Sequence, residues 1–537
     1  MPTSPLQRNI SRWEVELEND EDKQFLLQGI RNGFSILDDE KTHNIKPSFT
    51  KNSFSVIRDK DLVDKRINIE IQEGNYVITG TKPIVVSALS SIPKPDGDIR
   101  LIHDFSRPKD NSVNDYATVE HFRYQTLSDA INKLSPNSYM AKIDLLSAYR
   151  SVGLHPSNHP YTGLQWRGKY MYDTRLPFGA RKSPQIFNRI TQAVRRMMER
   201  RGFNSIIVYL DDFLVIGSSY AECLIAYKTL MSLLRSLGLS INYRKLVEPC
   251  QKLVFLGIEI NTVVGSIALE STKARNFLQL IDSLLTRRRI SRKELEKVTG
   301  KLSWASVVIP WGRLHIRPLY NRLTQMKSNN SKCLITHIAE SLQWWSEKIV
   351  QANGTKLMWD LREEIFALTD ASLHAGGAFC NGDWLYTAWL ADEPHLESQH
   401  INTKELAIIV SAAKRWGPMW ANKRIQILTD NVCAMWNINN GTCVNLTSLN
   451  LLRELCDLSL KFNFTIHASF ISSRDNFIAD SISRLHENGQ LPRFISVIPG
   501  GKPQSLVLNY HMTFKSMFFM SLQIQKWLNW VKNWTRK

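Results

Sequence analysis

Residues 205–216 read SIIVYLDDFLVI, in which two apolar runs flank the adjacent acids Asp211 and Asp212. Burying an ionised carboxylate is costly unless the group meets a partner or a metal. The pattern therefore predicts a β-hairpin whose tip directs both carboxylates toward a common site. Asp is also a common turn residue, so an ordinary Asp-containing turn would give the same pattern. Motifs elsewhere in the chain are needed to distinguish a metal site from an ordinary turn.

A third acid, Asp144, ends a short apolar run in the stretch MAKIDLLSAYR at residues 140–150. An acid at a strand end can complete a set of oxygen ligands. Mg²⁺ prefers such ligands while it keeps positions for water and substrate phosphate. Two such ions would activate an attacking hydroxyl group and stabilise a leaving oxygen.

An ordered series of motifs between Lys94 and Gly257 resembles reverse transcriptases. Tyr209-Leu210-Asp211-Asp212 resembles the Tyr-x-Asp-Asp box of that family. The other similar stretches are Lys94–Gly97 (KPDG), Arg100–Ser106 (RLIHDFS), Ser112–Asp115 (SVND), Asp144–Tyr149 (DLLSAY), Leu176–Gly179 (LPFG) with Ser183–Phe187 (SPQIF), Gly238–Lys245, and Phe255–Gly257 (FLG). Their order and spacing fit the family, and this favours the metal-binding interpretation of the hairpin.

The resemblance implies that Asp144 and Asp211, with Asp212 beside them, hold two Mg²⁺ ions, with Mn²⁺ as the alternative. It also implies that Lys94 and Arg100 bind the triphosphate of a deoxynucleoside triphosphate. Arg offers a planar fork for phosphate oxygens and Lys offers a point charge. For a single Lys, a solvated surface charge is the plainer interpretation.

Four more residues take roles from the same resemblance. Lys245 would donate a proton to the pyrophosphate leaving group, and Phe178 and Gly179 belong to the template-gripping motif. Tyr149 lies five residues after Asp144, where reverse transcriptases carry an aromatic gate against the ribose 2′-hydroxyl. Aromatic side chains also commonly serve as core, so packing against a sheet is the alternative for Tyr149.

A second group of acids, Asp370, Glu405, Asp430 and Asp480, lies near the ends of predicted elements. Singly, each acid fits a cap or a turn. In this order they resemble the ribonuclease H fold, which implies that they hold two divalent ions and that this part cuts RNA in an RNA–DNA hybrid. Many ribonucleases H carry a His loop before the last Asp, whereas residues 469–475 here read SFISSRD.

The composition fits a globular, intracellular protein. Hydrophobic residues make up 43% and charged residues 22%. No run approaches the ~18 apolar residues of a membrane helix, and the N-terminus lacks a signal-peptide core. We therefore expect no membrane partner, and a location in the cytoplasm, the nucleus or both. The 68 Lys and Arg against 50 Asp and Glu give +18, which favours a polyanionic partner, although a merely basic protein would have the same charge.

The predicted fold class is an α+β right-hand polymerase, with fingers, palm and thumb, followed by an α/β ribonuclease H-like domain. The predicted regions are an N-terminal extension (1–75), fingers and palm (76–260), a thumb-like helical region (261–330), a connector (331–360), the ribonuclease H-like domain (361–486) and a basic aromatic tail (487–537). Within the helical region, Ser291 and Glu294 form a capping-box signature.

Three further stretches, 29–34, 107–115 and 312–320, resemble the DIRS-type branch of long-terminal-repeat-like retrotransposons. The resemblance implies an RNA-directed DNA polymerase that copies a retroelement RNA, with ribonuclease H activity. Its partners would be an RNA or DNA template with primer, deoxynucleoside triphosphates, the RNA–DNA hybrid, and a recombinase or capsid-like protein from the same element. Two alternatives stay open: an inactive, domesticated nucleic-acid-binding relic, and a polymerase with a purely structural nuclease fold.

Overall fold

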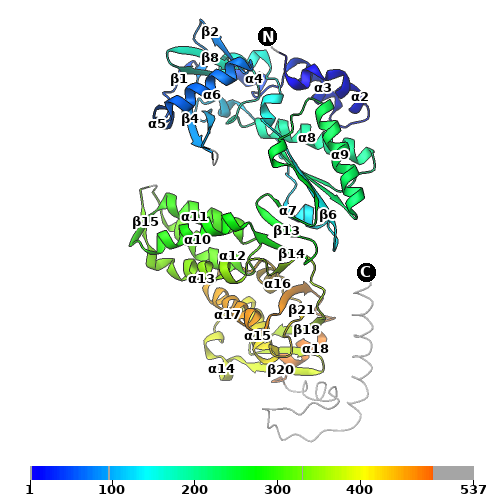
Figure 1. The fold of residues 1–537 in the computed structure, drawn as a ribbon. Coiled ribbons are helices and arrows are strands. Elements are labelled where there is room, and N and C mark those ends of the chain that lie inside the picture. Colours follow the sequence, from blue (N-terminus) through cyan, green and yellow to red (C-terminus); the bar gives the residue numbers. More distant parts are fainter. Residues whose placement is uncertain (1–2, 95–96, 329, 488–537) are drawn as a thin grey trace, which may run out of the picture. The chain divides into compact units, whose positions relative to one another are not determined.

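The computed structural model describes residues 3–94, 97–328 and 330–487 (Figure 1). The chain divides into two compact units, Met1–Ser266 and Ile267–Lys537. The predicted basic aromatic tail lies outside the described residues from position 488 onward. Among the helices of the described ranges, none is long and apolar enough to cross a membrane.

The first unit begins with short helices that belong to its main core. These helices are α1 (Pro5–Arg8), α2 (Ile10–Glu16), α3 (Lys23–Asn32) and α4 (Asp39–Thr42). Trp13 of α2 is fully buried, and its indole N–H donates to the carbonyl of Leu237 at 2.9 Å. Leu17 and Leu26 enter the same hydrophobic cluster as the strands described below. The N-terminal residues are therefore packed into the first unit.

A five-stranded sheet and a separate hairpin form one part of this unit. The sheet has the order β1-β3-β7-β8-β2, and β4 pairs with β5. The bounds are β1 (Ser48–Phe49), β2 (Tyr76–Thr79), β3 (Val85–Val86), β4 (Ala88–Pro93), β5 (Ile99–Asp104), β7 (Gly163–Trp166) and β8 (Lys169–Asp173). Helices α5 (Phe54–Arg58) and α6 (Lys60–Gln72) bury Val56, Val63 and Ile67 against these strands.

A four-stranded antiparallel sheet, in the order β11-β6-β10-β9, carries the decisive hairpin. Its strands are β6 (Tyr139–Asp144), β9 (Ile206–Tyr209), β10 (Asp212–Gly217) and β11 (Val247–Cys250). The predicted hairpin is confirmed, because β9 pairs with β10 and Leu210 and Asp211 form the turn. The register also places Asp212 opposite Asp144.

Two long helices, α8 (Ser183–Arg200) and α9 (Tyr220–Ser236), pack on this sheet (Figure 1). The alternating strand residues Val208, Phe213 and Val215 are fully buried beneath them. The remaining elements of the unit are η1 (Val113–Tyr116), α7 (Leu127–Ile131), η2 (Ala148–Ser151), η3 (Pro156–Tyr161), η4 (Tyr243–Lys245), β12 (Lys252–Phe255) and β13 (Ile258–Asn261). Strand β14 (Ser266–Leu269) lies at the boundary between the units.

The second unit begins with helices. They are α10 (Ser271–Leu285), α11 (Arg292–Ala305), α12 (Gly312–Gln325) and α13 (Ala339–Gln351), with the short elements β15 (Arg289–Ser291), β16 (Lys332–Leu334), η5 (Ile335–His337) and β17 (Lys356–Leu357). The predicted capping box at the start of α11 is confirmed. The Ser291 hydroxyl accepts the Glu294 N–H at 3.3 Å, and the Glu294 carboxylate accepts the Ser291 N–H at 2.9 Å.

The rest of the described second unit is built on a mixed sheet in the order β20-β19-β18-β21-β22. Its strands are β18 (Glu364–Ala371), β19 (Ala375–Cys380), β20 (Asp383–Ala388), β21 (Arg424–Thr429) and β22 (Thr465–Phe470), and its helices are α14 (Trp389–Asp392), η6 (Pro394–Leu396), α15 (Ile401–Trp416), α16 (Val432–Asn440), α17 (Leu446–Phe462) and α18 (Phe477–Ser483). Strand β21 is parallel to both β18 and β22. Ala367 packs with α15 and α17, and the next residue, Leu368, packs with α18, so the two faces carry different helices.

The packing of Trp13 predicts that Trp13→Ala destabilises the first unit by about 3–5 kcal/mol, because a buried Trp leaves a cavity. The measurement is the free energy of unfolding from urea titration. Val15, on the same helix but 65% exposed, supplies the control: Val15→Ala should change the value by less than about 0.5 kcal/mol. Equal effects of the two variants would contradict the described packing of α2.

Candidate active sites

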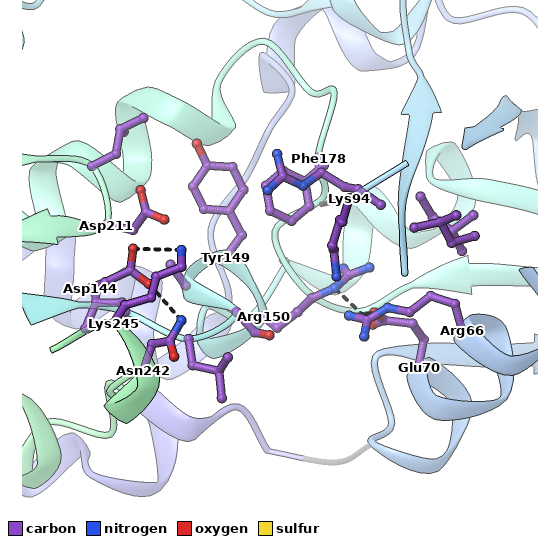
Figure 2. A pocket seen from close by; sticks show the side chains of 18 residues that line it. Arg66, Glu70, Lys94, Asp144, Tyr149, Arg150, Phe178, Asp211, Asn242 and Lys245 are labelled. Atoms are coloured by element: carbon purple, nitrogen blue, oxygen red, sulfur yellow. Dashed lines mark hydrogen bonds and ion pairs between the residues drawn. The ribbon is translucent and has the colours of Figure 1, made fainter. Parts of the chain in front are cut away.

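A cavity of about 690 Å³ in the first unit has two carboxylates at one end, Asp144 and Asp211 (Figure 2). The end of β6 supplies Asp144, and the turn between β9 and β10 supplies Asp211. Asp144 is 5% exposed and accepts hydrogen bonds from Asn242 Nδ2 at 3.0 Å and Lys245 Nζ at 3.1 Å. The predicted proton donor thus lies in contact with a predicted metal ligand.

The surroundings of Asp211 and Asp212 disfavour the ionised forms of their carboxylates. Burial raises the pKa of Asp211, and the neighbouring negative charges of Asp212 and Asp144 raise it further. Burial also raises the pKa of Asp212, although Lys142 opposes this shift. Asp212 does not line the cavity; its carboxylate pairs with Lys142 Nζ at 3.0 Å. The geometry thus brings two of the three predicted acids to the cavity and leaves the third beside a Lys.

Cations and aromatic rings line the rest of this cavity. Lys94 and Arg100 both line it, and Lys94 Nζ lies 2.9 Å from a carboxylate oxygen of Asp98. The Arg100 guanidinium lies over the ring of Phe178, at 5.6 Å from its centroid. The ring of Tyr149 is stacked on Phe178 at 4.8 Å. The cavity therefore has a carboxylate end, an aromatic wall and a basic wall.

Tyr149 and Gly179 have local constraints of their own. Tyr149 is 9% exposed and also contacts Phe187, with the ring centroids 5.2 Å apart, so it packs in the core while it lines the cavity. Gly179 has φ of +110°, and a Cβ there would lie 2.1 Å from the carbonyl oxygen of His103. Only Gly permits this close approach of the His103 backbone to the residue that follows Phe178.

Several cavity residues were not identified from the sequence. They are Arg66 and Glu70 on α6, Arg150 on η2, and Asn242 before η4. Asn242 lies within the motif-like stretch 238–245, and Arg150 directly follows Tyr149. The sequence motifs therefore pointed to the segments that contain these two residues, although not to the residues themselves. The spacing of Arg66 and Glu70 indicates only a helical pair, because nothing local says which surface that pair faces.

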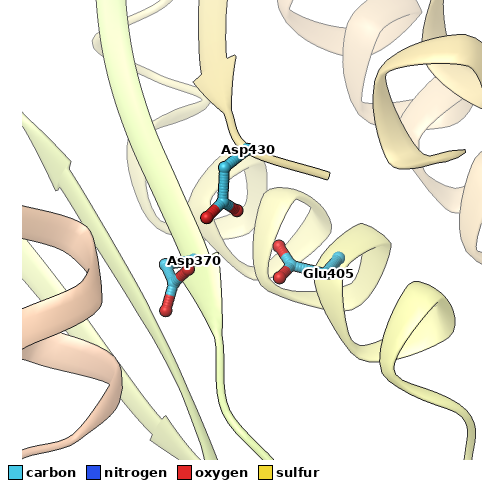
Figure 3. A group of neighbouring side chains, drawn as sticks. All are labelled: Asp370, Glu405 and Asp430. Carbon is cyan, nitrogen blue, oxygen red and sulfur yellow. The ribbon is translucent and has the colours of Figure 1, made fainter. Parts of the chain in front are cut away.

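The second candidate site joins Asp370, Glu405 and Asp430 (Figure 3). Asp370 lies near the end of β18, Asp430 directly follows β21, and Glu405 lies in the second turn of α15. Because β18 and β21 are parallel neighbours, their carboxyl ends meet at one edge of the sheet. One carboxylate oxygen from each residue lies within 4.8 Å of those of the other two.

These three acids suit a cation. Burial raises the pKa of Glu405 to about 9, helped by the charges of Asp370 and Asp430. Burial also raises the pKa of Asp370 to about 6; a hydrogen bond from Ser483 opposes this shift, while Asp430 and Asp480 add to it. Glu405 Oε2 is buried without a hydrogen-bond partner in the described part of the chain. A divalent ion would both neutralise the charges and give that oxygen a partner.

Asp480, the fourth predicted acid, lies outside this cluster of three. Its Oδ1 accepts a hydrogen bond from Arg484 Nε at 2.7 Å on α18, although its charge still acts on Asp370. Two serines that the sequence did not single out bind the cluster directly. Ser483 Oγ donates to Asp370 Oδ2 and Ser473 Oγ donates to Asp430 Oδ2, both at 2.6 Å.

Part of the first unit matches a known protein family. Residues 92–260 match the family model for reverse transcriptases (RNA-dependent DNA polymerases), so the chain contains a reverse transcriptase domain. The retrovirus-related Pol polyprotein from transposon opus of Drosophila melanogaster is 23% identical over 89% of this chain, and the genome polyprotein of petunia vein clearing virus is 21% identical over 72%. The chain spans 47% and 17% of the lengths of these relatives.

Solved structures show a similar fold. The foamy viral protease-reverse transcriptase dRH in complex with double-stranded DNA has a TM-score of 0.51 and is 18% identical. The match covers 86% of this chain and 81% of the foamy viral chain. The foamy viral protease-reverse transcriptase in complex with an RNA/DNA hybrid also has a TM-score of 0.51 and is 17% identical. This match covers 87% of this chain and 63% of the foamy viral chain. The fold of this chain is therefore similar to that of these two proteins, which is consistent with a polymerase fold.

The raised pKa values predict that the second unit loses stability as pH rises when no metal is present. A folded-state pKa of about 9 for Glu405, against an ordinary value of 4.5, means that the folded state holds the proton more tightly. The contribution of this proton to stability is therefore fully present below pH 4.5, and it is lost progressively as the pH rises from 4.5 to about 9. In a chelating buffer, the thermal midpoint of the wild type should fall between pH 6 and pH 9.

Glu405→Gln cannot titrate, so its thermal midpoint should fall less over the same range. Glu454→Gln is the control, because Glu454 is a half-exposed residue of the same unit that pairs with Lys414. It should follow the wild type. If the Glu405→Gln variant loses as much stability as the wild type, the buried carboxylate is not the cause of the pH dependence.

Proposed function

We propose that the chain is an RNA-directed DNA polymerase that also cleaves the RNA strand of RNA–DNA hybrids. The proposal rests on the cavity in the first unit, which has Asp144 and Asp211 at one end and Lys94 and Arg100 in its walls. All four residues lie within the stretch 92–260 that matches reverse transcriptases. Acids that hold metals beside cations that bind phosphates are what nucleotidyl transfer requires.

In the polymerase site, Asp144 and Asp211 would hold two Mg²⁺ or Mn²⁺ ions, with Asp212 in support. The bound ions would lower the pKa of the primer 3′-hydroxyl and stabilise the leaving oxygen. The 3′-hydroxyl would lose its proton to solvent water, and its oxygen would form a bond to the α-phosphorus while the bond between that phosphorus and the pyrophosphate oxygen breaks. Lys245, which pairs with Asp144 in the present structure, would supply a proton to the departing pyrophosphate. Lys94 and Arg100 would orient the triphosphate.

In the nuclease site, the cluster of Asp370, Glu405 and Asp430 supports divalent-ion binding, and Asp480 would join it by leaving Arg484. The serine contacts to Asp370 and Asp430 would hold two of the ligands in place. Two bound ions would activate water and stabilise the leaving oxygen of the RNA strand. The parallel β18–β21 pair and the helix that carries Glu405 are consistent with a ribonuclease H-like fold over residues 361–486.

The sequence motifs support finer assignments. We propose fingers and palm over 76–260, a thumb-like region over 261–330 and a connector over 331–360, in a retrotransposon protein of the DIRS-type branch. Template, primer, deoxynucleoside triphosphates and RNA–DNA hybrid would be its ligands, and a recombinase or capsid-like protein of the same element would be its partner. The foamy viral relatives were solved with double-stranded DNA and with an RNA/DNA hybrid, which supports these classes of substrate.

A reciprocal pair of variants tests the two activities. Asp211→Asn removes a charge that would bind metal and keeps the shape, so primer extension on RNA should fall by several orders of magnitude while hybrid cleavage persists. Asp430→Asn should abolish hybrid cleavage and leave extension on DNA templates intact. Both activities are measured on labelled substrates with and without Mg²⁺.

Each alternative predicts its own result in this assay. An inactive nucleic-acid-binding relic would bind a primer–template but neither extend nor cut it. A polymerase with a purely structural nuclease fold would extend the primer and leave hybrids intact. Near-normal extension by Asp211→Asn would contradict the proposed polymerase site.

The place of Tyr149 in the cavity wall predicts a role in choosing the sugar. If Tyr149 occupies the volume that a ribose 2′-hydroxyl needs, Tyr149→Val should accept ribonucleotides far more readily. The measurement is the ratio of kcat/KM for a ribonucleotide to that for its deoxy partner, in wild type and variant. Since Tyr149 is also packed on Phe178 and Phe187, a loss of a few kcal/mol in stability is expected as well. A folded variant with an unaltered ratio would assign Tyr149 to packing alone.

A further inference from the structure

Helix α6 brings an ion pair to the basic wall of the polymerase cavity. Arg66 Nη2 lies 2.7 Å from Glu70 Oε1, one helical turn along α6, and both residues line the cavity (Figure 2). The Glu70 side chain is 3% exposed, whereas the Arg66 side chain is 25% exposed. Both residues precede the stretch 92–260 that matches reverse transcriptases. The pair is therefore an addition to the cavity from outside the matched region.

Glu70 is fixed from its other side. Its Oε2 accepts Asn75 Nδ2 at 2.9 Å and pairs with Arg150 Nε at 3.0 Å. Arg150 Nη1 in turn donates to both carboxylate oxygens of Asp173, at 2.8 and 2.7 Å, and the Asp173 side chain is 0% exposed. Asp173 therefore already neutralises Arg150, and Glu70 is held in one position by this buried group.

This arrangement leaves Arg66 as the accessible member of the cluster. A guanidinium has five N–H donors, and one Glu70 oxygen satisfies only part of that set. Arg66 lies at the end of the cavity away from Asp144 and Asp211, on the same side as Lys94 (Figure 2). A triphosphate whose α-phosphate lies at the carboxylates would extend toward this end, with its terminal phosphate farthest along.

We propose that Arg66 is a further ligand for the terminal phosphate of the incoming deoxynucleoside triphosphate, held in position by Glu70. The inference rests on the proposed polymerase function. An Arg presents a planar fork that matches two phosphate oxygens, which suits the dianionic terminal phosphate better than the bridging ones. The fixed Glu70 keeps the guanidinium at the wall, so less side-chain freedom is lost on binding.

The test compares a deoxynucleoside triphosphate with the diphosphate of the same nucleoside, which lacks the terminal phosphate. Their Kd values are measured on the full chain bound to a primer–template whose primer ends in a dideoxynucleotide, so that binding occurs without reaction. In the wild type the triphosphate should bind more tightly than the diphosphate. Arg66→Met should weaken triphosphate binding about tenfold or more and leave diphosphate binding unchanged.

A matched control is available on α8, where Arg195 and Glu199 form another ion pair one helical turn apart that does not line the cavity. Arg195→Met should keep the wild-type Kd values for both nucleotides. Arg66→Lys keeps the charge but not the fork, so its preference for the triphosphate should be intermediate.

Two results would overturn the inference without touching the proposed function. One is an Arg66→Met variant with wild-type Kd for the triphosphate. The other is a variant that loses affinity equally for triphosphate and diphosphate, which would mean that Arg66 acts on the cavity as a whole. A wild type that binds neither nucleotide would overturn the proposed polymerase function, and this inference with it.

Discussion

Carboxylates of like charge repel one another more strongly as water is removed from between them. The antiparallel register of β6 and β10 places Asp212 opposite Asp144, and the turn before β10 adds Asp211. The apolar strands and the helices α8 and α9 hold this arrangement although the acids oppose it. Lys142, Asn242 and Lys245 relieve part of the repulsion, and the proposed cations would relieve the rest.

The second unit meets the same constraint with a different topology. Here the carboxyl ends of two parallel strands supply Asp370 and Asp430, and a helix supplies Glu405. Hydroxyl groups, from Ser473 and Ser483, take the place of the cationic partners found in the first unit. Burial, with the neighbouring charges of Asp370 and Asp430, raises the pKa of Glu405 to about 9.

Local patterns allowed the sequence to predict the elements that carry the sites. The β9–β10 hairpin and the capping box at Ser291 depend on neighbours in the chain, and both are found as predicted. Contacts between distant segments could not be predicted from the sequence. Nothing near Trp13 indicates that its indole N–H meets the carbonyl of Leu237, and nothing near Arg66 indicates that α6 lines the cavity. The pairing of Asp480 with Arg484 also competes with a metal role that the order of acids alone suggested.

We propose that one chain holds two separate cation sites built from buried carboxylates. Counting Mn²⁺ bound to the full chain by electron paramagnetic resonance tests it directly. We expect Asp211→Asn to remove the tightly bound Mn²⁺ of the first unit and Asp430→Asn to remove that of the second unit, and we expect the double variant to lose both. Unchanged Mn²⁺ binding in either single variant would contradict the claim for that site.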